Sequence, residues 1–173
     1  AYKARKTKKN QEMRGYTKMI KVLFICHGNI CRSPMAQYVF EDMIKKKGLS
    51  DCFEIDSAAT SREEIGNGVH HGTRRKLAEM GIPCGNHHAR QVTKADYEHF
   101  DYLIIMDANN RRNLMRIIGS DPYNKVHSLL DFSKNPRDIA DPWYTGNFDV
   151  TYDDIAEGCT DFLKYIQDKL YAE

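Results

Sequence analysis

The sequence predicts a single-domain α/β fold, in which helices flank an open four-stranded parallel sheet. Three observations predict it. Short runs rich in apolar and β-branched residues alternate with longer amphipathic stretches, as in strands joined by crossover helices. The first run, residues 21–26, is almost entirely apolar, which is typical of a strand buried on both faces of a parallel sheet. The chain has 173 residues, a length that suits one domain of ordinary size.

The alternation assigns each element in turn. Strands are expected at residues 21–26, 53–58, 102–106 and 125–130. The first helix is expected to begin at Ser33, a capping residue, with Pro34 in its first turn, and to end at Gly48. Its apolar face carries Met35, Ala36, Val39, Phe40 and Met43. The remaining helices are expected at residues 73–80, 94–99, 109–118 and 151–170.

The net charge of +2 conceals an uneven distribution. Residues 1–20 carry seven Lys and Arg side chains and one Glu, so the rest of the chain is mildly acidic at −4. Because residues 1–18 also lack apolar periodicity, we expect a disordered basic extension there and a folded domain over 19–173. A nucleic-acid partner is not expected for the acidic body, and only the basic arm leaves that role open.

Several classes of protein are excluded. No apolar run approaches the roughly 18 residues of a membrane span, and the short apolar stretch after the basic start lacks a signal-peptide cleavage site. The five cysteines are dispersed and odd in number, which favours a reducing, cytoplasmic compartment. The pairs His70-His71 and His87-His88 lack further ligands at metal-binding spacing, so no metal and no cofactor are expected.

The loop after the first strand has the composition of a phosphate-binding loop. A strand ends at Cys26, five residues follow, and Arg32 stands at the entrance of a helix. Gly28 and Asn29 are residue types that readily adopt left-handed backbone conformations, which would turn successive N–H groups inward as an anion-binding nest. The helix N-terminus adds a positive dipole end, so the loop is expected to bind a tetrahedral dianion.

The same loop suits nucleophilic chemistry. A helix N-terminus and an arginine both stabilise a thiolate, so Cys26 is a candidate to attack phosphorus and form a phosphocysteine. Arg32 would grip two phosphoryl oxygens with its planar fork, and Ser33 would steady the thiolate. The alternatives are a simple buried cysteine or a nucleotide-binding turn. The latter is disfavoured because a Gly-Lys-Ser/Thr ending and a spaced glycine triplet are both missing.

Residues 26–34 resemble the signature loop of the low-molecular-weight protein tyrosine phosphatases. The resemblance extends from Met19 to the C-terminus and includes further blocks in the family's order. These blocks are residues 56–59, residues 87–91, Met106 and Asp107 with Asn110, and residues 141–144.

The resemblance implies a role for each site residue. Cys26 would be the nucleophile, Arg32 the phosphoryl clamp, and Asp141 the acid that protonates the leaving oxygen and then the base that activates water. Pro142 disfavours helix at Asp141, which suits a loop leaning over the pocket. The substrate would be a phosphotyrosine-containing protein or peptide, and the product inorganic phosphate. The supporting and binding residues implied are His27, Gly28, Asn29, Ile30, Cys31, Ser33, His87, Trp143 and Tyr144.

Two related activities and one non-catalytic role remain as alternatives. A thiol-dependent arsenate reductase would need closely spaced later cysteines, but Cys84 stands alone. Protein-arginine phosphatases resemble one another in a Thr where this chain has Ile30, so an apolar wall favours a phenyl ring. A phosphate-binding or redox-sensing module would have no use for Asp141.

By resemblance, Cys31 and Cys26 are expected to form a reversible disulfide under oxidant.

The segment after the second strand departs from the family. Many members carry an aromatic residue at the pocket rim there, whereas this chain has Glu63 and Glu64. We expect weaker ring stacking on that side and discrimination against acidic residues flanking the phosphotyrosine.

Overall fold

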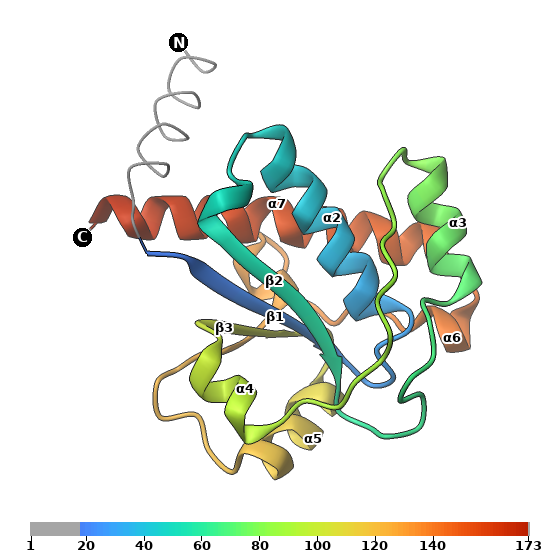
Figure 1. Cartoon of the computed structure of the whole chain (residues 1–173), viewed down its shortest axis with the longest axis horizontal. Helices are drawn as coiled ribbons and strands as arrows, with labels where there is room; N and C mark the ends of the chain where they lie inside the picture. Colours follow the sequence, from blue (N-terminus) through green and yellow to red (C-terminus); the bar gives the residue numbers. More distant parts are fainter. Residues whose placement is uncertain (1–17, 173) are drawn as a thin grey trace.

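A computed structural model of the chain describes residues 18–172, and it contains the predicted four-stranded parallel sheet. The strand order is β2-β1-β3-β4, with every neighbouring pair parallel. The sheet is open, with helices on both faces (Figure 1), and the predicted fold class is confirmed. The strands are β1 (Ile20–Cys26), β2 (Phe53–Ala59), β3 (Tyr102–Ile105) and β4 (Val126–Ser128).

The helices divide between the two faces of the sheet. Figure 1 shows α2, α3 and α7 on one side and α4 and α5 on the other. Short 3-10 turns, η1 (Ser50–Cys52) and η2 (Leu129–Phe132), precede β2 and follow β4. The α-helices are α2 (Arg32–Lys46), α3 (His71–Glu79), α4 (Lys94–His99), α5 (Ala108–Ile118), α6 (Pro142–Thr145) and α7 (Phe148–Ala172).

The central strand β1 is buried on both faces, which explains its continuous apolar run. Phe24 packs with Phe40 of α2 and Phe162 of α7, their ring centroids 5.7 and 6.5 Å away. On the opposite face, Leu23 and Ile25 belong to a separate apolar cluster with residues of α4 and α5. Because the chain runs from β1 outward to β2 and later returns to β3 on the other side, β1 ends at the topological switch point where α/β proteins bind ligands.

The N-cap of α2 lies two residues earlier than predicted. Its N-cap is Cys31, which makes no side-chain capping bond, so Ser33 lies inside the first turn and its hydroxyl is used elsewhere. The predicted end is correct. Gly48 takes φ 67°, and the N–H groups of Gly48 and Leu49 donate to the carbonyl oxygens of Lys45 and Ile44, as in a Schellman motif.

Other boundaries differ because tertiary contacts extend or shorten the elements. β4 is shorter than predicted, since residues 129–132 turn into η2 and bury Leu129 and Leu130. The helix α7 begins at Phe148 rather than residue 151, and α3 begins at His71, whose neighbour His70 caps it by accepting from the Gly72 N–H at 3.0 Å.

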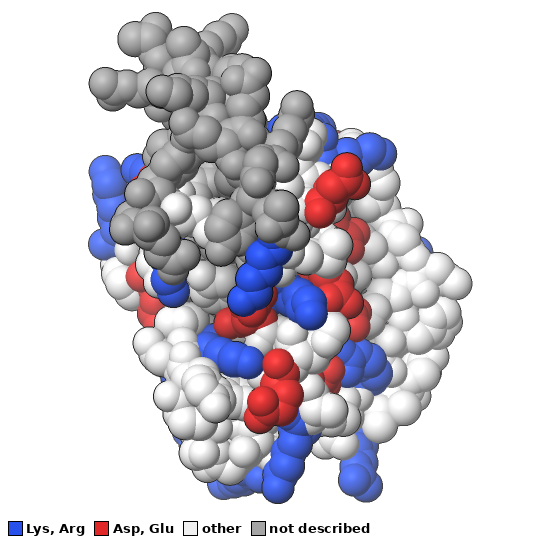
Figure 2. All heavy atoms as spheres, turned by 60° about the vertical axis from the view of Figure 1, so that its left-hand side comes forward, with Lys and Arg blue, Asp and Glu red and all other residues white. Residues whose placement is uncertain are grey.

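The predicted basic extension, residues 1–18, falls outside the described residues except for the exposed Lys18. Within the described part, acidic and basic side chains are interleaved on the face seen in Figure 2. No helix in residues 18–172 is long and apolar enough to cross a membrane.

A half-buried carboxylate holds the turn before β4 against α4. The Asp121 carboxylate accepts from the Tyr97 hydroxyl at 2.6 Å and from the N–H groups of Lys125 and Val126 at 2.8 and 3.1 Å. Burial alone would raise the pKa of Asp121, but these hydrogen bonds outweigh it and lower the pKa below its ordinary value.

We therefore expect Asp121→Asn to lower the free energy of unfolding by about 1–2 kcal/mol at pH 7, because a donor replaces an acceptor facing N–H groups. A depressed pKa stabilises the fold above the unfolded-state pKa of about 4, and this contribution is lost as the pH falls through the folded-state pKa. Urea unfolding at pH 7 and pH 3 measures it. The difference between parent and variant should shrink at pH 3, and the exposed Asp153→Asn should show no such difference at either pH.

Candidate active site

A pocket opens at the carboxyl end of β1 and contains most of the predicted site residues. It brings the loop after β1 together with Asp141, which lies 109 residues after Arg32. Asn29, Ser33 and His87 are behind the loop rather than in the pocket wall. The pocket is lined by Cys26, His27, Gly28, Ile30, Cys31, Arg32, Glu63, Glu64, Asp141, Trp143 and Tyr144.

The Cys26 sulfur lies at the focus of three hydrogen-bonding groups. The Ser33 Oγ is 3.0 Å from the sulfur, and the backbone N–H groups of Asn29 and Ser33 donate to it at 3.3 and 3.4 Å. The sulfur also lies at the N-terminus of the 15-residue helix α2, where the helix dipole is positive. Each of these groups turns a hydrogen-bond donor or a positive dipole end toward the sulfur.

Asn29 determines which way the Ser33 hydroxyl points. The Asn29 Oδ1 accepts from the Arg90 N–H at 3.3 Å, which fixes the amide so that Nδ2 donates to Ser33 Oγ at 2.7 Å. Because the Ser33 oxygen receives that donor, its own hydrogen is free for the Cys26 sulfur. Asn29 Nδ2 also donates to Ser57 Oγ at 2.9 Å, and Ser57 in turn donates to Gln37.

The backbone of the loop curls at one residue, not two. Asn29 has φ 59°, the left-handed conformation predicted for it, but Gly28 does not have a positive φ, so that part of the prediction is wrong. A Cβ on Gly28 would lie 3.4 Å from Glu64 Cγ, which shows that Glu64 packs directly over the loop. In the described chain, the N–H groups of residues 28, 30, 31 and 32 have no acceptor, which is the condition for an anion-binding nest.

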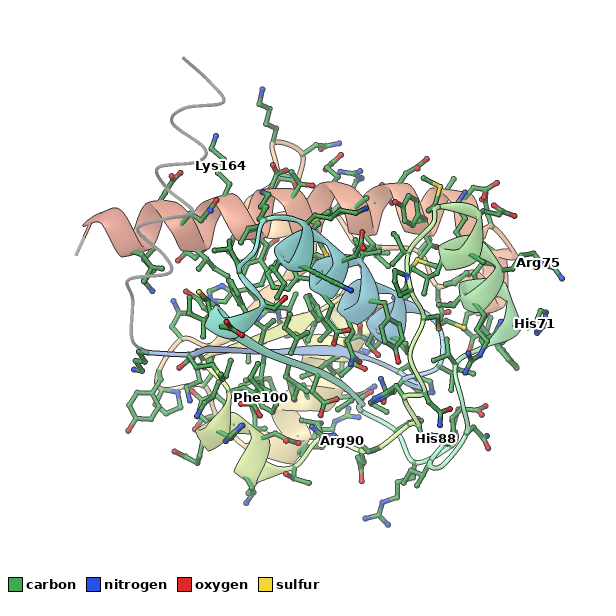
Figure 3. The ribbon with its side chains drawn as sticks, turned by 45° about the horizontal axis from the view of Figure 1, so that its top comes forward. His71, Arg75, His88, Arg90, Phe100 and Lys164 are labelled. Atoms are coloured by element: carbon green, nitrogen blue, oxygen red, sulfur yellow. The ribbon has the colours of Figure 1, made fainter. Side chains whose placement is uncertain are left out.

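His87 supports the loop from outside, and an arginine fixes the segment that carries it. His87 Nε2 lies 2.7 Å from Asn29 Oδ1, and burial lowers the pKa of His87. Arg90, three residues later (Figure 3), forms ion pairs with Asp56 at 3.0 Å and Asp96 at 2.9 Å. The segment is thereby tied to both β2 and α4.

Arg32 is almost fully buried and already oriented. Its side chain is 2% exposed, and NH1 donates to Asp107 Oδ2 at 2.6 Å and to the Ile139 carbonyl at 2.8 Å. Burial opposes its charge, but Cys26 and Asp107 outweigh that effect and raise the pKa of Arg32 above its ordinary value. A guanidinium held in this way can present its remaining N–H groups to a phosphoryl group.

Asp141 lies across the pocket at the start of a short helix. Its Oδ2 is 3.3 Å from Arg32 NH2, and its Oδ1 accepts from the Trp143 N–H at 3.0 Å. Asp141 is extended, as Pro142 predicts, but the following residues form α6 rather than the predicted loop, because proline at the first helical position favours a helix. Trp143 and Tyr144 line the pocket and are 58% and 82% exposed, which leaves both rings available to a ligand.

Comparison with known proteins identifies the family in which this site occurs. Residues 21–172 match the family model described as low molecular weight phosphotyrosine protein phosphatase. The chain belongs to this family. It is 43% identical over 151 residues to the low molecular weight protein-tyrosine-phosphatase YfkJ of Bacillus subtilis, covering 86% of this chain and 97% of that protein. It is 38% identical to the human low molecular weight phosphotyrosine protein phosphatase, covering 83% and 93% of the two chains.

Solved structures agree with the family assignment. The crystal structure of Bacillus subtilis YfkJ superposes with a TM-score of 0.86 at 42% identity, over 90% of this chain and 99% of that one. A Drosophila arginine phosphatase, DARP, superposes with a TM-score of 0.78 at 28% identity, over 85% of this chain and 98% of that one. The scaffold is therefore shared with an arginine phosphatase, while the more similar sequences are named tyrosine phosphatases.

Two polar residues of this phosphatase site have no role in the sequence-based prediction. Asp107 pairs with Arg32, and Ser57 receives the Asn29 amide. Both lie near the carboxyl ends of strands that neighbour β1, Ser57 in β2 and Asp107 two residues after β3. Their positions near strand ends could have indicated both residues from the sequence, since polar residues at those ends meet at one edge of a parallel sheet.

The second cysteine of the phosphatase loop, Cys31, is a buried thiol. Burial, followed by the Cys26 sulfur and the Asp141 carboxylate, raises the pKa of the Cys31 thiol to about 12. Cys31 is therefore protonated at neutral pH and is not a competing nucleophile, although it also lines the pocket.

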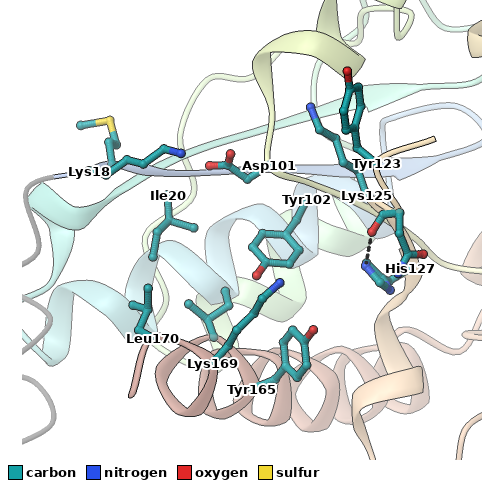
Figure 4. A pocket seen from close by; sticks show the side chains of 13 residues that line it. Lys18, Ile20, Asp101, Tyr102, Tyr123, Lys125, His127, Tyr165, Lys169 and Leu170 are labelled. Atoms are coloured by element: carbon teal, nitrogen blue, oxygen red, sulfur yellow. Dashed lines mark hydrogen bonds between the residues drawn. The ribbon is translucent and has the colours of Figure 1, made fainter. Parts of the chain in front are cut away.

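A second hollow lies at the opposite end of the sheet. It has a volume of about 320 Å³ and is lined by side chains that include Lys18, Tyr102, Tyr123, Lys125 and Lys169 (Figure 4). None of the predicted site residues lines it, and it adjoins the amino ends of the strands. In residues 18–172, no group of three or more His, Cys, Asp or Glu side chains could hold a metal ion.

Proposed function

We propose that the chain hydrolyses phosphotyrosine in proteins or peptides through a phosphocysteine at Cys26 and releases inorganic phosphate. One observation carries the proposal. Three hydrogen-bonding groups converge on the Cys26 sulfur within a loop whose arginine is oriented by Asp107. A simple anion-binding module would not need an activated sulfur, nor an acid across the pocket.

The first half-reaction transfers the phosphoryl group to sulfur. The Cys26 thiolate attacks phosphorus, an S–P bond forms, and the bond from phosphorus to the tyrosine oxygen breaks. Arg32 and the free N–H groups of the loop bind the equatorial oxygens, where charge develops. Asp141 donates its proton to the departing phenolate oxygen.

The second half-reaction returns the enzyme to its starting form. Asp141, now a carboxylate, takes a proton from water while the water oxygen attacks phosphorus. The S–P bond breaks, inorganic phosphate is released, and Cys26 leaves as a thiolate. The Ser33 hydroxyl, 3.0 Å from the sulfur, donates a hydrogen bond to this leaving group and lowers the barrier to its departure.

The pocket wall supports phosphotyrosine over phosphoarginine. Ile30 is only 9% exposed and contributes an apolar surface beside the loop, while Trp143 and Tyr144 provide aromatic faces. A phenyl ring packs favourably on such surfaces, whereas a guanidinium placed against Ile30 loses water. All five cysteines are free, which supports a cytoplasmic, reducing location.

Hydrolysis of p-nitrophenyl phosphate in excess EDTA tests the metal-independent mechanism. Rates on matched phosphotyrosine and phosphoarginine peptides then test the substrate. We expect turnover in EDTA and a higher kcat/KM for phosphotyrosine. No turnover would contradict the enzymatic proposal. A higher kcat/KM for phosphoarginine would mean that phosphoarginine, not phosphotyrosine, is the substrate.

The resemblance also predicts a protective disulfide, and Cys31→Ser tests it. After oxidation of Cys26 to a sulfenic acid, the Cys31 thiol would displace water and form the disulfide before further oxidation. Peroxide followed by dithiothreitol should restore most activity in the parent but little in the variant. Because the pKa of Cys31 is about 12, capture should quicken between pH 7 and pH 9. Equal recovery of both proteins would contradict the prediction, and Cys84→Ser should behave like the parent.

A further inference from the structure

One wall of the pocket carries two carboxylates that the proposed chemistry does not use. Glu63 and Glu64 follow β2 and both line the pocket, together with Cys26 and Arg32. The segment is fixed beside the loop, because the N–H groups of Thr60 and Ser61 donate to the carbonyl oxygens of Cys26 and His27 at 2.9 and 3.0 Å.

Both carboxylates are held in place at the pocket mouth. Glu63 Oε2 lies 3.0 Å from His27 Nε2, and its side chain is 69% exposed. Glu64 Oε2 accepts from Asn67 Nδ2 at 2.6 Å, and its Cγ packs over Gly28. These contacts orient the two groups and leave Glu63 largely open to a ligand.

The nearby arginines do not cancel this charge. Arg32 is buried and paired with Asp107 and Asp141, so it serves the phosphoryl group rather than the rim. Arg62 lies on the same segment, but its Nε donates to Gln91 Oε1 at 3.1 Å, and it does not line the pocket. The mouth of an anion-binding pocket therefore carries negative charge on one wall.

We propose that Glu63 and Glu64 are specificity-determining residues that select phosphotyrosine sites flanked by Lys or Arg and reject sites flanked by Asp or Glu. The inference rests on the proposed function and names a class of substrate within it. The phosphoryl group is bound by local contacts deep in the loop, whereas residues next to the phosphotyrosine pass the rim. There, opposite charges attract, and like charges raise the free energy of the complex.

Three peptides test the proposal, identical except that arginine, alanine or aspartate lies on both sides of the phosphotyrosine. At low ionic strength, kcat/KM should fall in that order, with about a tenfold ratio between the arginine and aspartate peptides. At 1 M salt the ratio should fall to about twofold, because the screening length shortens to about 3 Å.

The double variant Glu63→Gln/Glu64→Gln keeps both side chains nearly unchanged in shape and retains an acceptor for Asn67. Its arginine-to-aspartate ratio should drop to about twofold or less. The matched control, Asp51→Asn/Glu98→Gln, removes the same charge from exposed positions at the other end of the sheet. It should retain the parent ratio.

Each outcome bears on a separate claim. A parent ratio within twofold, or a tenfold ratio that persists in the rim variant or in 1 M salt, overturns the inference. If the arginine-to-aspartate ratio also drops in the control variant, selection depends on the net charge of the protein rather than on Glu63 and Glu64, and the inference is overturned. If neither the peptides nor p-nitrophenyl phosphate is hydrolysed, the proposed function fails, and the inference fails with it.

Discussion

Replacement of Cys26 by serine should lower kcat for p-nitrophenyl phosphate by at least about 10⁴-fold while phosphate binding persists. The serine hydroxyl is a far weaker nucleophile than the thiolate. The anion-binding groups remain, because Arg32 and the loop N–H groups are unchanged. Initial rates measure the first effect, and the rise in melting temperature with added phosphate measures the second.

The control for this variant is Cys84→Ser, since Cys84 lies outside the pocket and is also a free thiol. It should retain full activity. Turnover above about 1% of the parent in the Cys26 variant would mean that the nucleophile lies elsewhere. Cys31 would be a poor replacement, because its raised pKa leaves it protonated at neutral pH.

Replacement of Asp141 by asparagine should lower kcat/KM, which reports the first half-reaction, by about 10²–10⁴-fold on phosphotyrosine and far less on p-nitrophenyl phosphate. Asparagine keeps an oxygen that can accept from the Trp143 N–H, so α6 retains its cap, but it has no proton to donate. A leaving group with a low pKa departs without protonation, whereas the tyrosine oxygen does not. The measurement is kcat/KM across aryl phosphates of increasing leaving-group pKa.

Asp138→Asn serves as the matched control for this series, because Asp138 is exposed and outside the pocket. It should leave the dependence on leaving group unchanged. If the Asp141 variant loses kcat/KM equally on good and poor leaving groups, Asp141 is not the acid, and its contribution is to orient Arg32.

The parts of the structure that depend on local patterns were predictable. The apolar run of β1 and the periodic face of α2 each determine an element directly, and the spacing from Cys26 to Arg32 determines the loop. The prediction that Ser33 caps the helix was wrong, because its hydroxyl hydrogen-bonds with Asn29 and Cys26 instead. Helix-capping preferences are local in sequence and do not include such tertiary partners.

The polar support of the site was harder to predict for a related reason. Asp107 follows Arg32 by 75 residues and Ser57 follows Asn29 by 28, so their contacts depend on how the strands are ordered in the sheet. Periodicity gives the number and type of strands but not their neighbours. Once β1 is known to lie between β2 and β3, both residues fall beside the loop.

The distance along the chain between Arg32 and Asp141 has a consequence for synthesis on the ribosome. The nucleophile loop is translated 109 residues before the acid that completes it, and α7, which packs on α2, comes later still. At about 5–20 residues per second, roughly 5 to 20 s separate the two events. During that interval the nascent chain already carries Cys26 but lacks the acid, so this phosphatase becomes active only when nearly the whole domain has been made.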